Sequence, residues 1–347
     1  MYKVTIAIPV YNTQEYIEDS FLSALNQTFD NIEFLIIDDR GNDDSMSIVH
    51  ELMNSHERGK DVRIITHNKN MGLANVRNTA LIEATGDYLF FLDSDDTISE
   101  TCIEFLYDKI TKHPVDFIAA SFQVMNVEEQ FLRKCVYPDL IIEGENKIAE
   151  YQYKNLKKES IDNFSWNKLY NLSFLKDNNI NYIPGSLYED SYFSFNLILK
   201  AKSCILTSKI FYNYKIRPYS IMQNNDRKSI PVKEIEGHLL YLDYYKKESF
   251  KYKPYPFYED MITQIMVNCF DKISVLIDKR KVISENVSKK RINEILTYPI
   301  YFKEIYKFKH QKKINILLFT FSKLPFSIKV IFLKLYFKLL RFYRKIR

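Results

Sequence analysis

Residues 88–96 read YLFFLDSDD, an apolar run that ends at three carboxylates. A short apolar run bounded by polar residues predicts a buried strand. The carboxylates of Asp93, Asp95 and Asp96 would then lie where the strand leaves the core. Because like charges this close repel one another, we expect a cation as their partner. The stretch therefore predicts a divalent metal that holds a phosphate-bearing ligand.

The residues around this stretch alternate between strand and helix patterns. Strands are predicted at 4–10, 32–37, 62–66 and 88–92, and helices at 15–25, 45–55 and 73–84. The alternation predicts an α/β fold, a mostly parallel sheet flanked by helices. Ligands bind beyond the carboxyl ends of such strands. Tyr11–Asn12 and Asp38–Asp39 also follow strands, so three loops should converge on one acidic crevice.

The pattern changes twice after this region. Further helices are predicted at 101–112 and 187–201 and strands at 115–123 and 205–214, whereas 125–160 shows no clear pattern. From about residue 232, apolar residues recur at helical spacing over 232–250 and 257–282. We therefore expect a helical region after the α/β domain.

The end of the chain is basic and apolar. Glu304 is the last acidic residue, and twelve Lys or Arg follow it. Within 326–347, a helix would place five cations on one stripe: Lys329, Lys334, Lys338, Arg341 and Lys345. A basic amphipathic helix rich in Phe and Leu favours an anionic membrane surface. The alternative is a helix docked on the protein's own core.

Several classes of protein are disfavoured. The four cysteines form no C-x-x-C pair, which favours a reducing compartment over a disulfide framework. The N-terminus lacks the pattern of a signal peptide, no long uncharged apolar stretch predicts a spanning helix, and no glycine-loop nucleotide motif occurs. We expect a cytoplasmic protein, peripheral at the inner face of the cell membrane, with no nucleic-acid partner.

A set of short motifs gives the chain a family resemblance. They are Pro9–Asn12, Leu25–Thr28, Ile36–Asp39, Asn70–Asn78, Phe91–Asp96, Trp166–Tyr170 and Tyr188–Asp190. In this order and spacing the chain resembles glycosyltransferase family 2, the GT-A fold enzymes that use nucleotide-activated sugars. The resemblance covers about residues 1–222. It implies a catalytic domain over 1–222, with a nucleotide-binding half (1–100) and an acceptor half (101–222), followed by a helical extension (223–304) and a membrane-associating tail (305–347).

The resemblance also implies how the nucleotide is held. Pro9 and Tyr11 would line the base pocket, with Tyr11 against the uracil ring. Asp39 would accept a hydrogen bond from the base, which makes a UDP-sugar the expected donor. Asn70 and Arg77 would contact the nucleotide or its phosphates.

The reacting end of the donor falls to the other motifs. Asp93 and Ser94 would contact the ribose or sugar, and Asp95, with Asp93, would bind Mn²⁺ or Mg²⁺. Asp190 would be the catalytic base, with Glu189 as a supporting residue and a candidate for contact with the acceptor. Both also suit the first turn of a helix, where the dipole favours an anion.

Two further residues are candidates for contact with the acceptor. Trp166, the only tryptophan, is predicted either to stack on an acceptor sugar or to belong to the core. Arg217 is predicted either to close over the diphosphate or acceptor or to lie in a surface loop.

These features predict an inverting, metal-dependent glycosyltransferase. It would move a sugar from a UDP-sugar to a hydroxyl of a glycan or lipid-linked saccharide, in bacterial surface polysaccharide biosynthesis. One alternative is a catalytically inactive GT-A domain that serves as a sugar-binding or scaffold module at the membrane. The other is a nucleotidyltransferase that uses the same acidic crevice.

Overall fold

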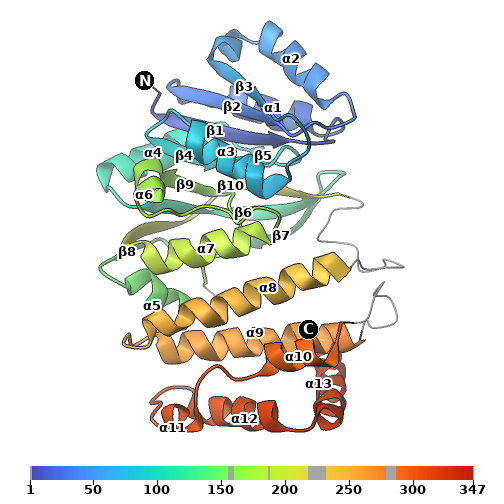
Figure 1. The fold of residues 1–347 in the computed structure, drawn as a ribbon. Coiled ribbons are helices and arrows are strands. Elements are labelled where there is room, and N and C mark those ends of the chain that lie inside the picture. Colours follow the sequence, from blue (N-terminus) through green and yellow to red (C-terminus); the bar gives the residue numbers. More distant parts are fainter. Residues whose placement is uncertain (1, 155–159, 187, 218–231, 279–286, 347) are drawn as a thin grey trace. The chain divides into compact units, whose positions relative to one another are not determined.

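The computed structural model of the chain describes residues 2–154, 160–186, 188–217, 232–278 and 287–346, with side chains of the last helix described up to Tyr336 (Figure 1). The chain forms two compact units, Met1–Asn224 and Asn225–Arg347. The predicted boundary between residues 222 and 223 lies outside the described residues. The predicted regions 223–304 and 305–347 fall in a single unit.

The first unit opens with four parallel strands in the order β3-β2-β1-β4. Their elements are β1 (Val4–Val10), α1 (Ile17–Leu25), β2 (Ile32–Asp38), α2 (Ser45–Ser55), the 3-10 helix η1 (Glu57–Asp61), β3 (Val62–Thr66), α3 (Leu73–Glu83) and β4 (Tyr88–Phe91). Every residue of β1 and β2 is buried, as expected of strands covered on both faces. The predicted strands and helices of this half are confirmed.

The remainder of the first unit completes a mixed sheet. Its elements are β5 (Thr97–Ile98), α4 (Cys102–Lys112), β6 (Phe117–Asn126), β7 (Phe131–Cys135), β8 (Leu140–Glu143), α5 (Lys147–Lys154), β9 (Lys168–Asn171), α6 (Leu172–Asp177), α7 (Glu189–Lys200) and β10 (Ser203–Ile216). Strand β9 lies between β4 and β6 and is antiparallel to both, so β6 runs in the direction of β4. The prediction of a mostly parallel sheet holds for the long strands and misses the short antiparallel ones.

The carboxyl ends of β1, β2 and β4 lie at one edge of the sheet, because these strands are parallel. Backbone bonds continue past the strand ends and hold the loops in place. Asp39 N donates to Val10 O and Leu92 N donates to Ala7 O, both at 3.0 Å. The loops that carry Tyr11, Asp39 and Asp93 therefore leave the sheet side by side.

The described elements of the second unit are all helices. They are α8 (Val232–Ser249), η2 (Phe250–Tyr252), α9 (Tyr258–Asp278), α10 (Lys289–Leu296), α11 (Phe302–Ile305), α12 (Lys312–Lys323) and α13 (Phe326–Ile346). Helix α9 packs against α8, α10, α12 and α13. It buries Ile262, Ile265, Met266, Cys269 and Ile273, at the predicted helical spacing. Among the described helices, none has both the length and the apolar character needed to cross a bilayer.

Helix α13 is docked along one face and exposed along another. Lys329 is only 4% exposed and donates a hydrogen bond to Asn293 Oδ1 at 2.8 Å, and Leu333 is buried nearby. Lys329, one of the five cations of the predicted stripe, therefore lies on the docked face of α13, where Asn293 is its polar partner. The exposed apolar side chains are Ile328, Ile331, Phe332 and Leu335. The side chains of Lys338, Arg341 and Lys345 lie outside the described part.

A close backbone approach fixes the turn that leads into β4. Gly86 N donates to Thr5 Oγ1 at 2.9 Å, and Thr5 Oγ1 donates to the buried carboxylate of Glu33 at 2.6 Å. A Cβ atom on Gly86 would lie 2.6 Å from Thr5 N, which is backbone and cannot turn away. Glycine is therefore required here by space.

We predict that Gly86→Ala lowers the free energy of unfolding by about 1–3 kcal/mol, because the added methyl forces β1 and β4 apart. Urea unfolding of the full chain followed by circular dichroism measures this loss. Ile82→Ala, at a side chain that is 73% exposed, is the control and should change stability by less than about 0.5 kcal/mol. Equal stability of the two variants would contradict the packing argument.

Candidate active site

The turn after β4 divides its carboxylates between two roles. Asp96 is fully buried, and its oxygens accept hydrogen bonds from Lys215 N and the Tyr212 hydroxyl, both at 2.8 Å. Asp96 thereby ties the turn to β10 and faces no ligand. Asp93 and Asp95 stay partly exposed at the sheet edge.

Asp93 and Asp95 each face an arginine. Arg77 Nη2 lies 2.9 Å from Asp93 Oδ1, and Arg217 Nε lies 2.7 Å from Asp95 Oδ2. Burial raises the pKa of Asp95 to about 6, against the opposing effect of Arg217 and with a further rise from Asp93. A nearby cation stabilises the charged form of a carboxylate whose pKa is raised by burial. Asp93 and Asp95 together therefore suit a hard divalent metal.

The metal ligands that the chain offers are few. Among the described residues, no group of three or more His, Cys, Asp or Glu side chains is arranged to hold a metal ion. Mg²⁺ is typically bound by one or two carboxylates together with substrate phosphate oxygens. Asp93 and Asp95 fit that pattern.

Arg77 of α3 joins this turn to the start of α7. Its guanidinium is 1% exposed and pairs with Asp93, with Glu189 Oε1 at 3.1 Å, and with Asp190 Oδ1. It also lies over the rings of Phe91 and Tyr182. Three carboxylates therefore surround the Arg77 guanidinium in this structure, and its expected contact with the nucleotide or its phosphates stays a prediction.

Glu189 and Asp190 occupy the first turn of α7. Burial raises the pKa of Glu189 to about 7, and the Asp190 charge adds to the rise. Burial likewise raises the pKa of Asp190, while Arg77 and the Ser165 hydroxyl oppose that shift. The Asp190 side chain remains 23% exposed. A reachable carboxylate whose pKa is raised suits a general base.

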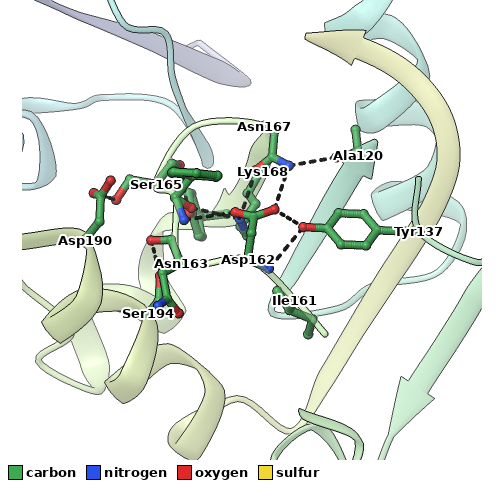
Figure 2. A network of polar contacts seen from close by, with 12 residues as sticks. Ala120, Tyr137, Ile161, Asp162, Asn163, Ser165, Asn167, Lys168, Asp190 and Ser194 are labelled. Carbon is green, nitrogen blue, oxygen red and sulfur yellow. Dashed lines mark hydrogen bonds and ion pairs between the residues drawn. The ribbon is translucent and has the colours of Figure 1, made fainter. Parts of the chain in front are cut away.

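A buried polar loop lies behind Asp190 (Figure 2). Lys168 Nζ donates to Asp162 Oδ1, Phe164 O and Asn167 Oδ1 at 2.8–2.9 Å. Ser165, between these residues, donates a hydrogen bond to Asp190 Oδ1. Our sequence interpretation missed Ser165, although it directly precedes the motif Trp166–Tyr170.

The predicted base pocket holds one exposed ring and one buried carboxylate. Tyr11 is 45% exposed and Pro9 is buried. Asp39 is buried, because it accepts hydrogen bonds from Met71 N and Gly72 N at 2.8 Å and contacts His67 Nδ1 at 2.7 Å. Both carboxylate oxygens of Asp39 thus already have partners in this structure, and its expected hydrogen bond from the base stays a prediction. Two other predicted contacts differ in exposure: Asn70 is exposed and Ser94 is buried.

Comparison with known proteins identifies the family. A model of the family described as "Glycosyl transferase family 2" matches residues 5–178, half of the chain. The chain belongs to glycosyl transferase family 2.

Similar members of the family come from several bacteria. The chain is 31% identical to the putative glycosyltransferase EpsH of Bacillus subtilis, over 65% of this chain and 64% of that protein. It is 28% identical to the cholesterol galactosyltransferase of Borreliella burgdorferi, over 61% of this chain and 59% of that protein. The match therefore spans less than two thirds of the length of these relatives.

A solved structure shares the fold. Staphylococcus aureus TarS 1–349, solved in complex with UDP-GlcNAc, superposes with a TM-score of 0.65 at 17% identity, over 92% of this chain and 90% of that one. The fold is thus the predicted GT-A fold with a helical C-terminal region.

In this family 2 chain, the structure favours the second of the two predictions for Trp166, a place in the core. Trp166 is 2% exposed, and the rings of Phe164 and Tyr212 stack on it with centroids 4.4 Å away. Protein rings already occupy the contact that a sugar would make, so Trp166 belongs to the core. Arg217 lies at Asp95, and its contact with a diphosphate or an acceptor stays a prediction.

We predict that Arg77→Met lowers the free energy of unfolding by about 3–5 kcal/mol at pH 8, because three carboxylates lose their cation. The deficit should shrink at pH 5. Without the cation the carboxylate pKa values rise in the folded state, so protons bind as the pH falls and remove the repulsion. Urea unfolding at both pH values measures this.

Lys112→Met is the matched control for the arginine variant. Lys112 pairs with Asp108 on the exposed face of α4, so its loss should change stability by less than about 1 kcal/mol at either pH. An Arg77→Met deficit as small as that of the control would contradict the role of Arg77 as a buried link.

Proposed function

We propose that the protein is an inverting, metal-dependent glycosyltransferase. It moves a sugar from a UDP-sugar to a hydroxyl of a glycan or lipid-linked saccharide in bacterial surface polysaccharide biosynthesis. The observation that supports this most directly is the partly exposed carboxylate of Asp190. It pairs with the same Arg77 guanidinium as Asp93, which lies in the turn after β4. One group can then hold the donor while the other activates the acceptor.

The substrates named for similar proteins support the choice of substrates. TarS is solved with UDP-GlcNAc and with UDP. WfgD of Escherichia coli, 29% identical over 52% of this chain, is a UDP-Glc:alpha-D-GlcNAc-diphosphoundecaprenol beta-1,3-glucosyltransferase. A uridine diphosphate donor and a lipid-linked acceptor are therefore the substrate classes that we propose for this chain.

The chemistry assigns one task to each carboxylate. Asp95 and Asp93 would hold Mn²⁺ or Mg²⁺, which neutralises charge on the diphosphate leaving group when bound. Asp190 takes the proton of the acceptor hydroxyl as that oxygen attacks the anomeric carbon. Attack from the side opposite to UDP inverts this carbon, and a positioned base contributes about 10²–10⁴-fold to the rate.

We predict that Asp190→Asn lowers UDP release by about 10²-fold or more while the donor still binds. Asp95→Asn should instead abolish the stimulation by Mn²⁺. A screen of UDP-sugars with and without Mn²⁺, followed by titration calorimetry of the active donor, separates these effects. Asp108→Asn, at an exposed ion pair of α4, is the matched control and should retain full activity.

Other outcomes of this screen would identify the alternatives. Pyrophosphate release in place of UDP release would indicate a nucleotidyltransferase. Donor binding without turnover in the wild-type protein would indicate a catalytically inactive module.

We also propose that the second unit binds an anionic membrane surface through α13. The support is twelve Lys or Arg without an acid after Glu304, together with exposed Ile331, Phe332 and Leu335. Apolar side chains would enter the interface while neighbouring cations contact lipid headgroups. A lipid-linked acceptor would then share a surface with the enzyme.

We predict that Ile331→Glu weakens binding to phosphatidylglycerol vesicles about tenfold or more, because an apolar contact becomes a repelled charge. Vesicle co-sedimentation measures this, with neutral vesicles alongside. Ile82→Glu makes the same change at an exposed site of α3 and should leave binding intact. Equal binding by both variants would contradict the membrane proposal. Deletion of residues 305–347 would also remove Asn315 of α12, which forms hydrogen bonds with Thr263 and Tyr298 inside the second unit. A point variant avoids the loss of these bonds.

A further inference from the structure

The two carboxylate oxygens of Asp190 have different surroundings. Both described partners of Asp190, Ser165 Oγ and Arg77 Nη1, contact Oδ1. Within the described part of the chain, no hydrogen bond or ion pair ends on Oδ2. Because the side chain is partly exposed, Oδ2 is the oxygen available to a ligand.

The hydroxyl of Ser165 is fixed in direction by a second hydroxyl. Ser165 is fully buried, and the Tyr182 hydroxyl donates to Ser165 Oγ at 2.7 Å. A serine hydroxyl has one hydrogen to donate. Ser165 accepts the Tyr182 hydrogen on one lone pair and donates its own hydrogen to Asp190 Oδ1.

Tyr182 is itself held by the two helices that carry Arg77 and Asp190. Its backbone N and O bond to the Asn78 side chain of α3 at 2.9 and 2.8 Å. Its ring stacks on Phe193 of α7, with centroids 4.4 Å apart and planes at 4°. The hydroxyl of Tyr182 therefore has little freedom to turn away from Ser165.

The loop that carries Ser165 is held just as firmly (Figure 2). The three hydrogens of the Lys168 ammonium are matched by three acceptors, including Asp162, which also accepts a hydrogen bond from the Tyr137 hydroxyl. The Tyr170 hydroxyl donates to Ser165 O at 2.8 Å. A buried network with its charge fully paired resists displacement.

We propose that Ser165 is a positioning residue that, together with Tyr182, holds Oδ1 of Asp190 and leaves Oδ2 to take the acceptor proton. This inference rests on the proposed glycosyl transfer. In that step the acceptor O–H bond breaks and its proton moves to Oδ2. The acceptor oxygen forms a bond to the anomeric carbon, and the bond from that carbon to the phosphate oxygen breaks, with its electron pair leaving on UDP.

The charged and titratable groups around Asp190 act in different directions. Arg77 and Lys168 favour its anion, whereas Asp93 and Glu189 disfavour it. Ser165, in contrast, is neutral and donates a hydrogen bond directly to the Asp190 carboxylate. Its removal thus changes the base without altering the net charge of the site.

The test is the pH dependence of UDP release by the full chain from pH 5 to 9, with the UDP-sugar that the donor screen selects. Ser165→Ala removes a hydrogen bond to the anion, so Asp190 holds its proton to higher pH. The acidic limb of the pH profile, where UDP release rises with pH, should move up by about one pH unit, and activity should recover at high pH. Tyr182→Phe should move it in the same direction by less, because Ser165 keeps its hydroxyl.

Ser194→Ala provides the matched control. Ser194 is a buried serine of α7, one turn after Asp190, and its hydroxyl donates to Asn163 O of the same loop at 2.8 Å and not to the Asp190 carboxylate. Its removal tests loosening of the loop alone, and its acidic limb should stay in place. Ser165→Thr, which keeps the hydroxyl, should restore the wild-type limb.

The outcomes distinguish the two levels of the proposal. Wild-type protein that releases no UDP from any UDP-sugar would overturn the proposed function. The positioning role alone would be overturned if the wild-type protein is active and Ser165→Ala leaves the acidic limb of the pH profile in place. It would also be overturned if Ser194→Ala moves that limb equally.

Discussion

The burial of one guanidinium constrains the whole candidate site. A buried cation without partners costs several kcal/mol, so Arg77 must keep its carboxylates close. Those carboxylates come from the turn after β4 and from the first turn of α7, about a hundred residues apart. The ion pairs therefore fix the distance between the turn after β4 and the first turn of α7.

The sheet topology makes this arrangement possible. Strand β9 enters between β4 and β6 and begins at Lys168, directly after the loop that carries Ser165. The pairing of β9 with β4 brings that loop to the same region as the strand end with Asp93. The short antiparallel strand begins at this edge of the sheet, and the loop before it places the buried hydroxyl of Ser165 at Asp190.

Local sequence patterns predicted the parallel strands, because burial on both faces leaves continuous apolar runs. They also predicted most of the helices and the carboxylates at the strand ends. Local patterns missed elements whose signal is weak or whose burial depends on distant partners. Strand β7 is mostly exposed, so its residues FLRKC do not form the continuous apolar run of a buried strand. Arg77 and Lys329 are cations, which are ordinarily exposed. Their burial is stabilised by partners that are distant in the sequence, Asp190 for Arg77 and Asn293 for Lys329. Trp166 belongs to the core because Phe164 and Tyr212 cover it.

The separation between Arg77 and Asp190 has a consequence for synthesis of the chain on the ribosome. The strands β1 to β4 and the turn with Asp93 emerge first, and Arg77 then has one of its three carboxylate partners. Until α7 has emerged, neither Glu189 nor Asp190 can complete the cluster, and long-range contacts of this kind form late. A nascent chain would thus carry Arg77 and the turn with Asp93 before it carries Glu189 and Asp190, so the guanidinium gains its full set of ion pairs only after α7 has formed.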